Sequence, residues 1–218
     1  MRLSNGESEV RGAYLEWEAY LLNPRMRRTG QSISWLGDNR ERPTERPTSL
    51  EIAQLAAQGQ YSFQAARDFA LFRLWYDFEA DGTTLRSASL GYYAIELEDA
   101  YELDEIGAEV LGLVGDDRIC RWLRIDYDPL SARGVLHSAC HLHLGGIHGS
   151  RVVVDAVPSP AQFLEFVIAI CYPDDYKTHR LNAAGALVNQ AKLQAMKGTS
   201  LPVIRHSEEE LVLQVAVP

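Results

Sequence analysis

The stretch FALFRLWYDFEADGTTLRSASLGYYAI, residues 69–95, decides the fold of this chain. It contains two runs rich in aromatic and aliphatic residues, 69–78 and 84–95, and such runs are typical of β-strands. Between them lies Ala80-Asp81-Gly82-Thr83, whose Asp-Gly pair is typical of a type I′ hairpin turn. The stretch therefore predicts an antiparallel hairpin.

The turn also predicts the register of this hairpin. If Ala80 faces Thr83, the pairs further along the two strands follow by counting outward from the turn. The expected pairs are Phe78 with Leu85, Asp77 with Arg86, and Trp75 with Ala88. An apolar pair and a pair of opposite charges at facing positions favour this register.

Further strands and helices surround the hairpin in the sequence. Strand-like segments are 121–128, 135–144 and 152–157, and a strand-like tail, ELVLQVAV, covers 210–217. Apolar spacing of three and four residues predicts helices over 6–22, 105–113 and 175–196. Thr48 with Glu51 predicts a capped helix that ends before Gly59, and Ser159-Pro160-Ala161-Gln162 begins another.

These elements together indicate an α+β fold. Helices at both ends with hairpin-connected strands between them predict an antiparallel sheet of about five strands with helices packed on one face. The length of 218 residues fits a single domain. Within it we expect an N-terminal helix in 1–24, an exposed arginine- and proline-rich loop in 25–48, the sheet core in 61–172, and a C-terminal helix and strand in 174–218.

Polar residues alternate along WLRIDYDPLSARGVLHSACHLHLGG, residues 122–146. Alternate side chains of a strand share a face, so Arg124 lies with Asp126, and His137 lies with His141 and His143. The intervening apolar residues should all pack against helices. We therefore expect the arginine, the aspartate and the histidines on the opposite, open face of the sheet.

Two chemistries could use this polar face. Paired histidines can act as general acid and base while Arg124 stabilises an oxyanion, and this route needs no metal or other cofactor. Alternatively, His141 and His143 could bind a divalent metal with His137 or Asp126 as the third ligand, although Arg124 opposes a cation unless it pairs with Asp126. A third interpretation is a solvated sheet face without a function.

Composition narrows the possible partners and the location. A formal net charge of −9 opposes a broad electropositive surface for duplex binding, although arginines cluster in the N-terminal third. The three cysteines, Cys120, Cys140 and Cys171, form no C-x-x-C pair and are typical of a reduced protein. The N-terminus has no apolar segment, and the run FLEFVIAIC is too short to span a bilayer. We expect a cytoplasmic protein without membrane contact.

Four short motifs resemble a bacterial family of uncharacterised proteins, known as a domain of unknown function. In chain order they are QYSFQAARDFALFRLWYDFEADGTTLRSASLGYY, WLRIDYDP, HLHLGG and SRVVVDAVPSPAQFLEFVIAICYP, and they span about residues 61–172. The elements RIDYD and HLHLGG are also similar to the R-x-D and H-x-H core of the TumE-type toxins of bacterial toxin–antitoxin systems. The resemblance implies a protein of bacterial conflict, with Arg124, Asp126, His141 and His143 at the motif positions.

Three hypotheses for the function follow. The first is a bacterial toxin or anti-phage defence effector that acts on nucleic acid, an RNase-like enzyme that uses His141, His143 and His137 with Arg124 and Asp126 and no metal. The second is a noncatalytic subunit or adaptor, which would bind a protein partner or a second copy through the C-terminal strand and the arginine- and proline-rich loop. The third is a metal-dependent hydrolase that uses the H-x-H pair.

Overall fold

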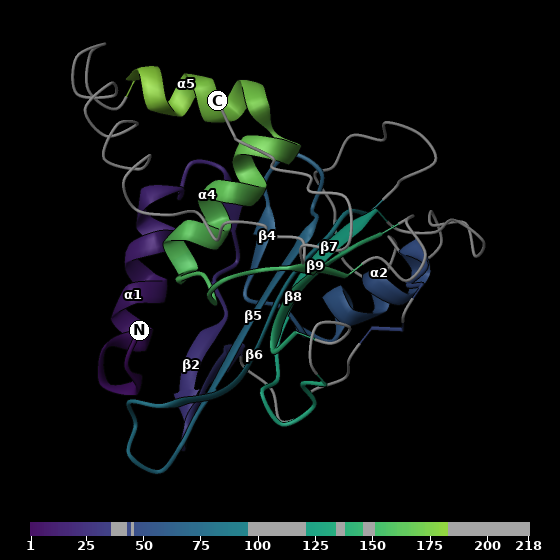
Figure 1. Cartoon of the computed structure of the whole chain (residues 1–218). Helices are drawn as coiled ribbons and strands as arrows, with labels where there is room; N and C mark the ends of the chain where they lie inside the picture. The colour runs from purple at the N-terminus through teal and green to yellow at the C-terminus, as the bar shows by residue number, and fades with distance from the viewer. Residues whose placement is uncertain (36–42, 45, 96–120, 134–137, 146–150, 183–218) are drawn as a thin grey trace.

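The computed structural model describes residues 1–35, 43–44, 46–95, 121–133, 138–145 and 151–182 (Figure 1). Its helices are α1 (Leu3–Glu16), α2 (Ser49–Ala57), α4 (Pro160–Cys171) and α5 (Pro173–Asn182). Its strands are β1 (Leu21–Leu22), β2 (Met26–Thr29), β3 (Ser32–Trp35), β4 (Phe63–Ala65), β5 (Leu71–Phe78), β6 (Leu85–Tyr93), β7 (Trp122–Tyr127), β8 (Cys140–Leu144) and β9 (Arg151–Val153). The α+β class predicted from the sequence is confirmed.

The strands form one nine-stranded sheet in which neighbouring strands are antiparallel. The order is β1-β4-β5-β6-β7-β8-β9, and β3 pairs with both β2 and β5. The expected number of about five strands was too low. Part of the difference comes from segment 25–48, expected as a loop, where Gly30 has a φ of +59° and lies between the hairpin strands β2 and β3.

The β5–β6 hairpin is present, but its predicted register holds only next to the turn. Phe78 faces Leu85 as expected, and the ladder then shifts by one residue, so that Asp77 faces Ser87 and Trp75 faces Ser89. The shift leaves Arg86 as an extra residue on β6, and its Nε lies 3.2 Å from Oε1 of Glu79. This β-bulge changes which side chains of β5 and β6 lie beside each other.

The turn itself is not a type I′ turn. That turn requires positive φ at both central residues, whereas here Gly82 has a φ of +64° and Asp81 does not have a positive φ. The Asp81 carboxylate instead accepts hydrogen bonds from the backbone N–H groups of Thr83 and Thr84, at 2.8 and 2.9 Å. The side chain of Asp81 therefore stabilises a longer, four-residue loop closed by the bond from Glu79 N–H to the Thr84 carbonyl.

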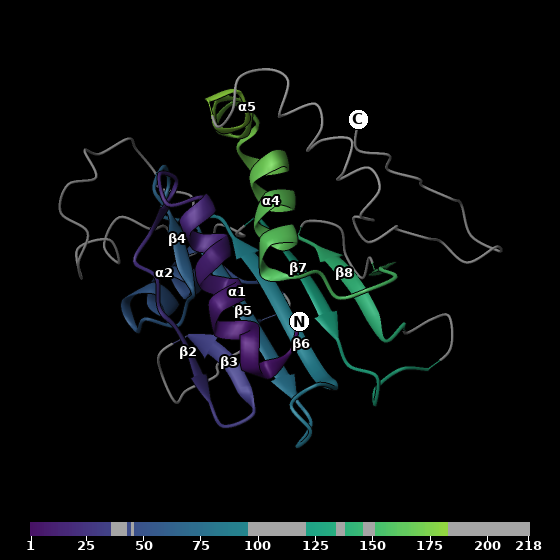
Figure 2. The same cartoon turned by 90° about the vertical axis from the view of Figure 1, so that its left-hand side faces the viewer.

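Helices α1 and α4 cover one face of the sheet (Figure 2). Helix α4 begins as predicted: Ser159 Oγ accepts from the Gln162 N–H, and Gln162 Oε1 accepts from the Ser159 N–H. The main buried core on this side contains Val10, Phe163, Leu164 and Val167 from the helices, Trp17 at the end of α1, and Phe72, Leu74, Leu90, Ile125 and Leu142 from the strands. Each such side chain contributes roughly 1.5–3 kcal/mol on burial, so this layer is the main source of stability.

Helix α2 lies on the other side of the sheet, which corrects the expectation that all helices pack on one face (Figure 1). Its Ile52 and Leu55 pack with Leu71, Tyr93 and Ile95, which belong to or follow the strands. The helix begins at the predicted cap, where Thr48 Oγ1 accepts from the Glu51 N–H at 3.1 Å. The polar face of β7 and β8 is therefore bordered by a second, smaller apolar cluster.

The remaining predictions concern the helix ends. Helix α1 covers Leu3–Glu16 rather than 6–22, because the chain turns at 17–20 and continues into β1. The helix expected over 105–113 and the strand expected over 210–217 lie outside the described residues, as does the end of the helix expected over 175–196. Across the residues that the structure describes, each helix is too short or too polar to cross a membrane.

Candidate functional site

Strands β7 and β8 bring four of the predicted site residues together. Arg124 faces His143 and Asp126 faces His141 in the antiparallel ladder. Their apolar neighbours Leu123, Ile125, Cys140 and Leu142 belong to the core beneath α1 and α4. The shared polar face predicted from the alternation is thus confirmed for these four residues, whereas His137 lies outside the described residues.

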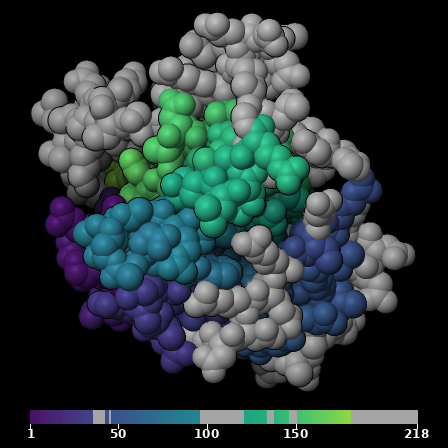
Figure 3. All heavy atoms as spheres, turned by 60° about the horizontal axis from the view of Figure 1, so that its bottom comes forward, coloured from purple at the N-terminus to yellow at the C-terminus, as the bar shows by residue number. Residues whose placement is uncertain are grey.

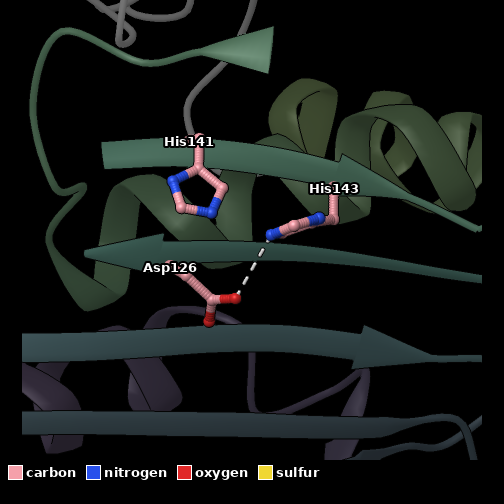
Figure 4. A group of neighbouring side chains, drawn as sticks. All are labelled: Asp126, His141 and His143. Atoms are coloured by element: carbon pink, nitrogen blue, oxygen red, sulfur yellow. Dashed lines mark ion pairs between the residues drawn. The ribbon is translucent and has the colours of Figure 1, made fainter. Parts of the chain in front are cut away.

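Asp126 is the centre of this cluster. Its Oδ2 accepts a hydrogen bond from Arg124 Nε at 2.7 Å, and its Oδ1 accepts one from Ser89 Oγ at 2.8 Å. His143 Nε2 lies 3.4 Å from the same Oδ2 (Figure 4). The side chains of Arg124, Asp126 and His143 are only 17–18% exposed. Asp126 therefore holds the guanidinium of Arg124 and the ring of His143 in place within a partly desolvated site.

His141 is the buried member, with 4% of its surface exposed. Its Nδ1 lies 2.9 Å from the carbonyl oxygen of Ser138, and because a carbonyl only accepts, Nδ1 carries a proton. The other ring nitrogen is directed toward Asp126 and His143 (Figure 4). The centroids of the two histidine rings are 4.6 Å apart, edge to face. The backbone thus fixes both the tautomer and the orientation of His141.

The environment of His143 keeps this histidine neutral. Its pKa is lowered to about 4, mainly by burial and then by the positive charge of Arg124 and by His141 and Arg151, while Asp126 acts in the opposite direction. At neutral pH the ring is therefore uncharged and able to accept a proton. Cys140, in contrast, is not suited to nucleophilic attack, because burial and the charge of Asp126 raise its pKa to about 12.

A row that contains three arginines and His143 crosses the sheet through this cluster. In register from β5 to β9 the row is Arg73, Gly91, Arg124, His143 and Arg151. Arg151 is exposed at one end, Arg124 and His143 are half-buried, and Arg73 is buried at the other end. Arg73 and Ser89 were missed from the sequence: the bulge at Arg86 moves Arg73 relative to the predicted register, and Ser89 meets Asp126 through the β6–β7 pairing, whose register the sequence did not predict.

Two aromatic rings lie beside Arg124. Tyr93 and Trp122 stack with ring centroids 6.3 Å apart, and the guanidinium carbon of Arg124 is 5.6 Å from the Trp122 ring. Each ring occupies the space over a glycine: a Cβ on Gly145 would lie 2.7 Å from Trp122 Cδ1, and one on Gly91 would lie 2.5 Å from Tyr93 Cε2. Gly145 therefore lets the Trp122 ring lie against the end of the neighbouring strand, and Gly91 lets the Tyr93 ring lie along its own strand, β6.

Among the described residues, the cavity that adjoins the cluster is small. A cavity of about 20 Å³, enough for a single water molecule, lies between Arg73 and Arg124 and is also lined by Trp35 and Trp75. A larger cavity of about 250 Å³, between Phe72, Ile168 and Tyr172, is lined by core residues of the helix-covered face. The atoms of β7 and β8 form part of the molecular surface (Figure 3). A substrate at the cluster would thus bind on a surface rather than inside a deep pocket.

The side chains of the cluster are of types that bind metal ions, but the positive charge beside them is unfavourable for a cation. One ligand atom each of Asp126, His141 and His143 lies within 4.8 Å of the others. A histidine whose Nδ1 donates to a carbonyl, as His141 does, is a usual arrangement in metal sites. However, Arg124 donates into the same oxygen of Asp126 that His143 approaches, and its positive charge opposes a divalent cation there.

Comparisons with known proteins identify a family without a described activity. Searches of the curated proteins and of the solved structures found no match. A family model described as an uncharacterized conserved protein, DUF2290, matches residues 18–215, which includes every residue of the site described above. The chain belongs to this family of uncharacterised conserved proteins, DUF2290.

Proposed function

We propose that this protein is a bacterial toxin or anti-phage effector that cleaves RNA without a metal ion. The observation that carries the proposal is the placement of two histidines beside an arginine that Asp126 holds, on a face that α1 and α4 leave open. The similarity of RIDYD and HLHLGG to the TumE-type toxins supports the toxin role.

RNA suits this site as a substrate because its own 2′-hydroxyl is the nucleophile, so the protein does not have to supply one. His143, neutral at pH 7, takes the proton of the 2′-hydroxyl as that oxygen attacks the adjacent phosphorus. The bond from phosphorus to the 5′-oxygen breaks, and the leaving oxygen receives a proton from the nitrogen of His141 that faces the site (Figure 4). Because Nδ1 keeps the proton that it donates to Ser138, this step requires His141 in its doubly protonated form, which becomes neutral as the proton leaves. The products are a 2′,3′-cyclic phosphate and a free 5′-hydroxyl.

Arg124 stabilises the charge that develops on the phosphoryl oxygens. Its Nε is engaged with Asp126 and its side chain also hydrogen-bonds Tyr93, and these contacts fix the plane of the guanidinium. The remaining N–H groups of the guanidinium serve the phosphate. Asp126 and Ser89 act as positioning residues, because they orient Arg124 and His143 rather than contact the reacting atoms in this scheme.

Expression in bacteria tests this proposal. Induction of the wild-type chain should slow growth and degrade cellular RNA, whereas His143→Gln should do neither. The matched control is His179→Gln, because His179 stacks on Trp17, a residue of the helix-covered core. Wild-type protein that leaves growth and RNA unaffected, or a His143→Gln variant as active as wild type, would contradict the proposal.

A metal-dependent hydrolase is the second candidate, favoured by the Asp126, His141 and His143 ligand atoms that lie within 4.8 Å of one another. Elemental analysis of the purified protein distinguishes the two. A stoichiometric transition metal that is lost in Asp126→Asn, together with hydrolysis that Zn²⁺ or Mn²⁺ restores after chelation, would replace the metal-free scheme.

A further inference from the structure

Trp122 occupies an unusual place for a tryptophan in a sheet. It lies on the polar face at the start of β7, and it is half-buried rather than covered. Its ring centroid is 6.4 Å from that of His143, and its ring is 5.6 Å from the guanidinium carbon of Arg124. This partly exposed indole lies beside the groups that would act on a phosphodiester, with the guanidinium of Arg124 over its ring.

The neighbouring strand is built to accommodate that indole. Gly145 follows β8, and its N–H donates to the Trp122 carbonyl at 2.6 Å. A Cβ at Gly145 would lie 2.7 Å from Cδ1 and 2.9 Å from Nε1 of Trp122, so any other residue would displace the ring. Tyr93 supports the ring from the β6 side through the stacked contact.

Two positive side chains lie in the row beside Trp122, Arg124 and Arg151, with the neutral His143 between them. From Arg124 the row continues through His143 to Arg151, which is exposed on the edge strand β9. Arg124 and Arg151 are two strands apart in the sheet, or about 10 Å at the backbone. Aromatic platforms next to a line of cations are the usual features of proteins that bind single-stranded nucleic acid.

We propose that this face binds single-stranded nucleic acid, with one base stacked on Trp122 and the backbone phosphates along the row from Arg124 to Arg151. This inference rests on the proposed function and names its substrate class. A duplex does not fit, because its paired bases present no free face to an indole. The net charge of −9 also opposes the broad contact that a duplex backbone needs.

Binding can be measured separately from cleavage. The probe is a fluorescein-labelled oligouridine of about ten nucleotides with 2′-O-methyl groups, which block cleavage and leave the bases free to stack. Anisotropy is followed at several salt concentrations for the wild-type chain, Trp122→Leu, Trp122→Phe and Arg151→Gln. The competitors are an RNA duplex of the same length and inorganic phosphate. Arg86→Gln is the matched control, because Arg86 is an exposed arginine at the hairpin bulge, outside the row.

The expected pattern is specific to the inference. Trp122→Leu should weaken binding about tenfold or more, while Trp122→Phe should retain most of it because a flat ring remains. Arg151→Gln should weaken binding and reduce the salt slope by about 0.7, the value for one phosphate contact on a single strand. Arg86→Gln should bind like wild type. Arg151→Gln keeps the test valid if Trp122→Leu does not fold.

The contrary results separate the inference from the proposed function. Tighter binding of the duplex, binding of inorganic phosphate alone, or wild-type affinity in both Trp122→Leu and Arg151→Gln would overturn the inference. If ordinary RNA is cleaved while these variants bind the probe normally, the proposed function survives without the inference. If the probe binds as expected and ordinary RNA stays intact, the inference stands and the cleavage proposal fails.

Discussion

The two faces of β7 and β8 are made by alternating residues of the same two strands, and they differ in how they are held together. On one face, Leu123, Ile125, Leu142 and Cys140 are at most 6% exposed and pack in the core beneath α1 and α4. On the other, Arg124, Asp126 and His143 are held by hydrogen bonds and ion pairs and remain partly accessible.

Because of this difference, one face of the strands mainly stabilises the fold and the other mainly orients polar side chains. Apolar burial is non-directional and contributes most of the folding free energy, so the helix-covered face can anchor the strands without specific polar contacts. Each hydrogen bond of the polar face contributes less free energy of folding, but it fixes the orientation of the two groups that it joins. A rigid apolar layer beneath Asp126 is what allows its three contacts to orient Arg124, Ser89 and His143.

The largest expected effect on stability comes from a substitution in the helix-covered face. Phe163 in α4 is fully buried, and Phe163→Ala should lower the free energy of unfolding by about 3–5 kcal/mol. Ile170→Ala on the same helix is the control, because Ile170 is 54% exposed and should change stability by less than about 0.5 kcal/mol. Urea denaturation followed by circular dichroism measures both. Equal losses of stability in the two variants would contradict the claim that the buried, helix-covered face is the main source of stability.

A smaller loss of stability but a larger loss of activity is expected at Asp126. Asp126→Asn removes the carboxylate that Arg124 and His143 approach, leaving a half-buried guanidinium without its partner, and should cost about 1–3 kcal/mol. Ser89→Ala removes one neutral donor and should cost about 0.5–1.5 kcal/mol. Urea denaturation and RNA cleavage are measured on both variants. An Asp126→Asn variant with full activity would show that the polar contacts do not orient the site.

The pH dependence of stability tests the neutral state of His143. Its pKa is about 4 in the folded chain against 6.5 for an ordinary histidine, so between these values the unfolded chain binds the extra proton. Stability therefore falls as the pH drops from 6.5 toward 4, and the effect is absent at neutral pH. Because the ring is partly solvated, the loss should be on the order of 1 kcal/mol.

His143→Gln removes this titration and provides the comparison. The difference in the free energy of unfolding between pH 7 and pH 5, measured by urea denaturation, should be smaller in the variant than in wild type. The same difference in both proteins would mean that the folded chain does not hold His143 in its neutral form.

The smallest effect on stability is expected from a substitution at the bulge of the β5–β6 hairpin. Arg86 and Glu79 are 50% and 48% exposed and form an ion pair in which both partners are well solvated. Arg86→Gln should leave the Tm unchanged within the precision of a thermal melt. A clear decrease in Tm would show that the bulge depends on this ion pair.

Local patterns were sufficient to predict the elements that make the site. The hairpin in 69–95, the caps at Thr48 and Ser159, and the alternation on β7 and β8 were all predicted from neighbouring residues, and the structure confirms them. Each depends on contacts a few residues apart, which a sequence displays directly. The residues Arg124, Asp126, His141 and His143 were found in this way.

Features that depend on distant contacts were not predicted. The bulge at Arg86 changes the β5–β6 register and brings Arg73 opposite Gly91 in the row of arginines. The pairing of β6 with β7, which are distant in the sequence, brings Ser89 opposite Asp126. The β2–β3 hairpin was not predicted, because the arginines and prolines of segment 25–48 indicated an exposed loop. His141 was expected on an open face and is buried, because burial depends on the neighbouring strands and loops rather than on its own alternation.

Cleavage of single-stranded RNA by the purified chain in the presence of EDTA tests the central claim most directly. The account predicts products with 2′,3′-cyclic phosphate ends, and a rate reduced about 100-fold or more in His143→Gln, with unfolding at pH 7 nearly unchanged. Equal rates in wild type and His143→Gln, or cleavage that requires an added divalent metal, would contradict it.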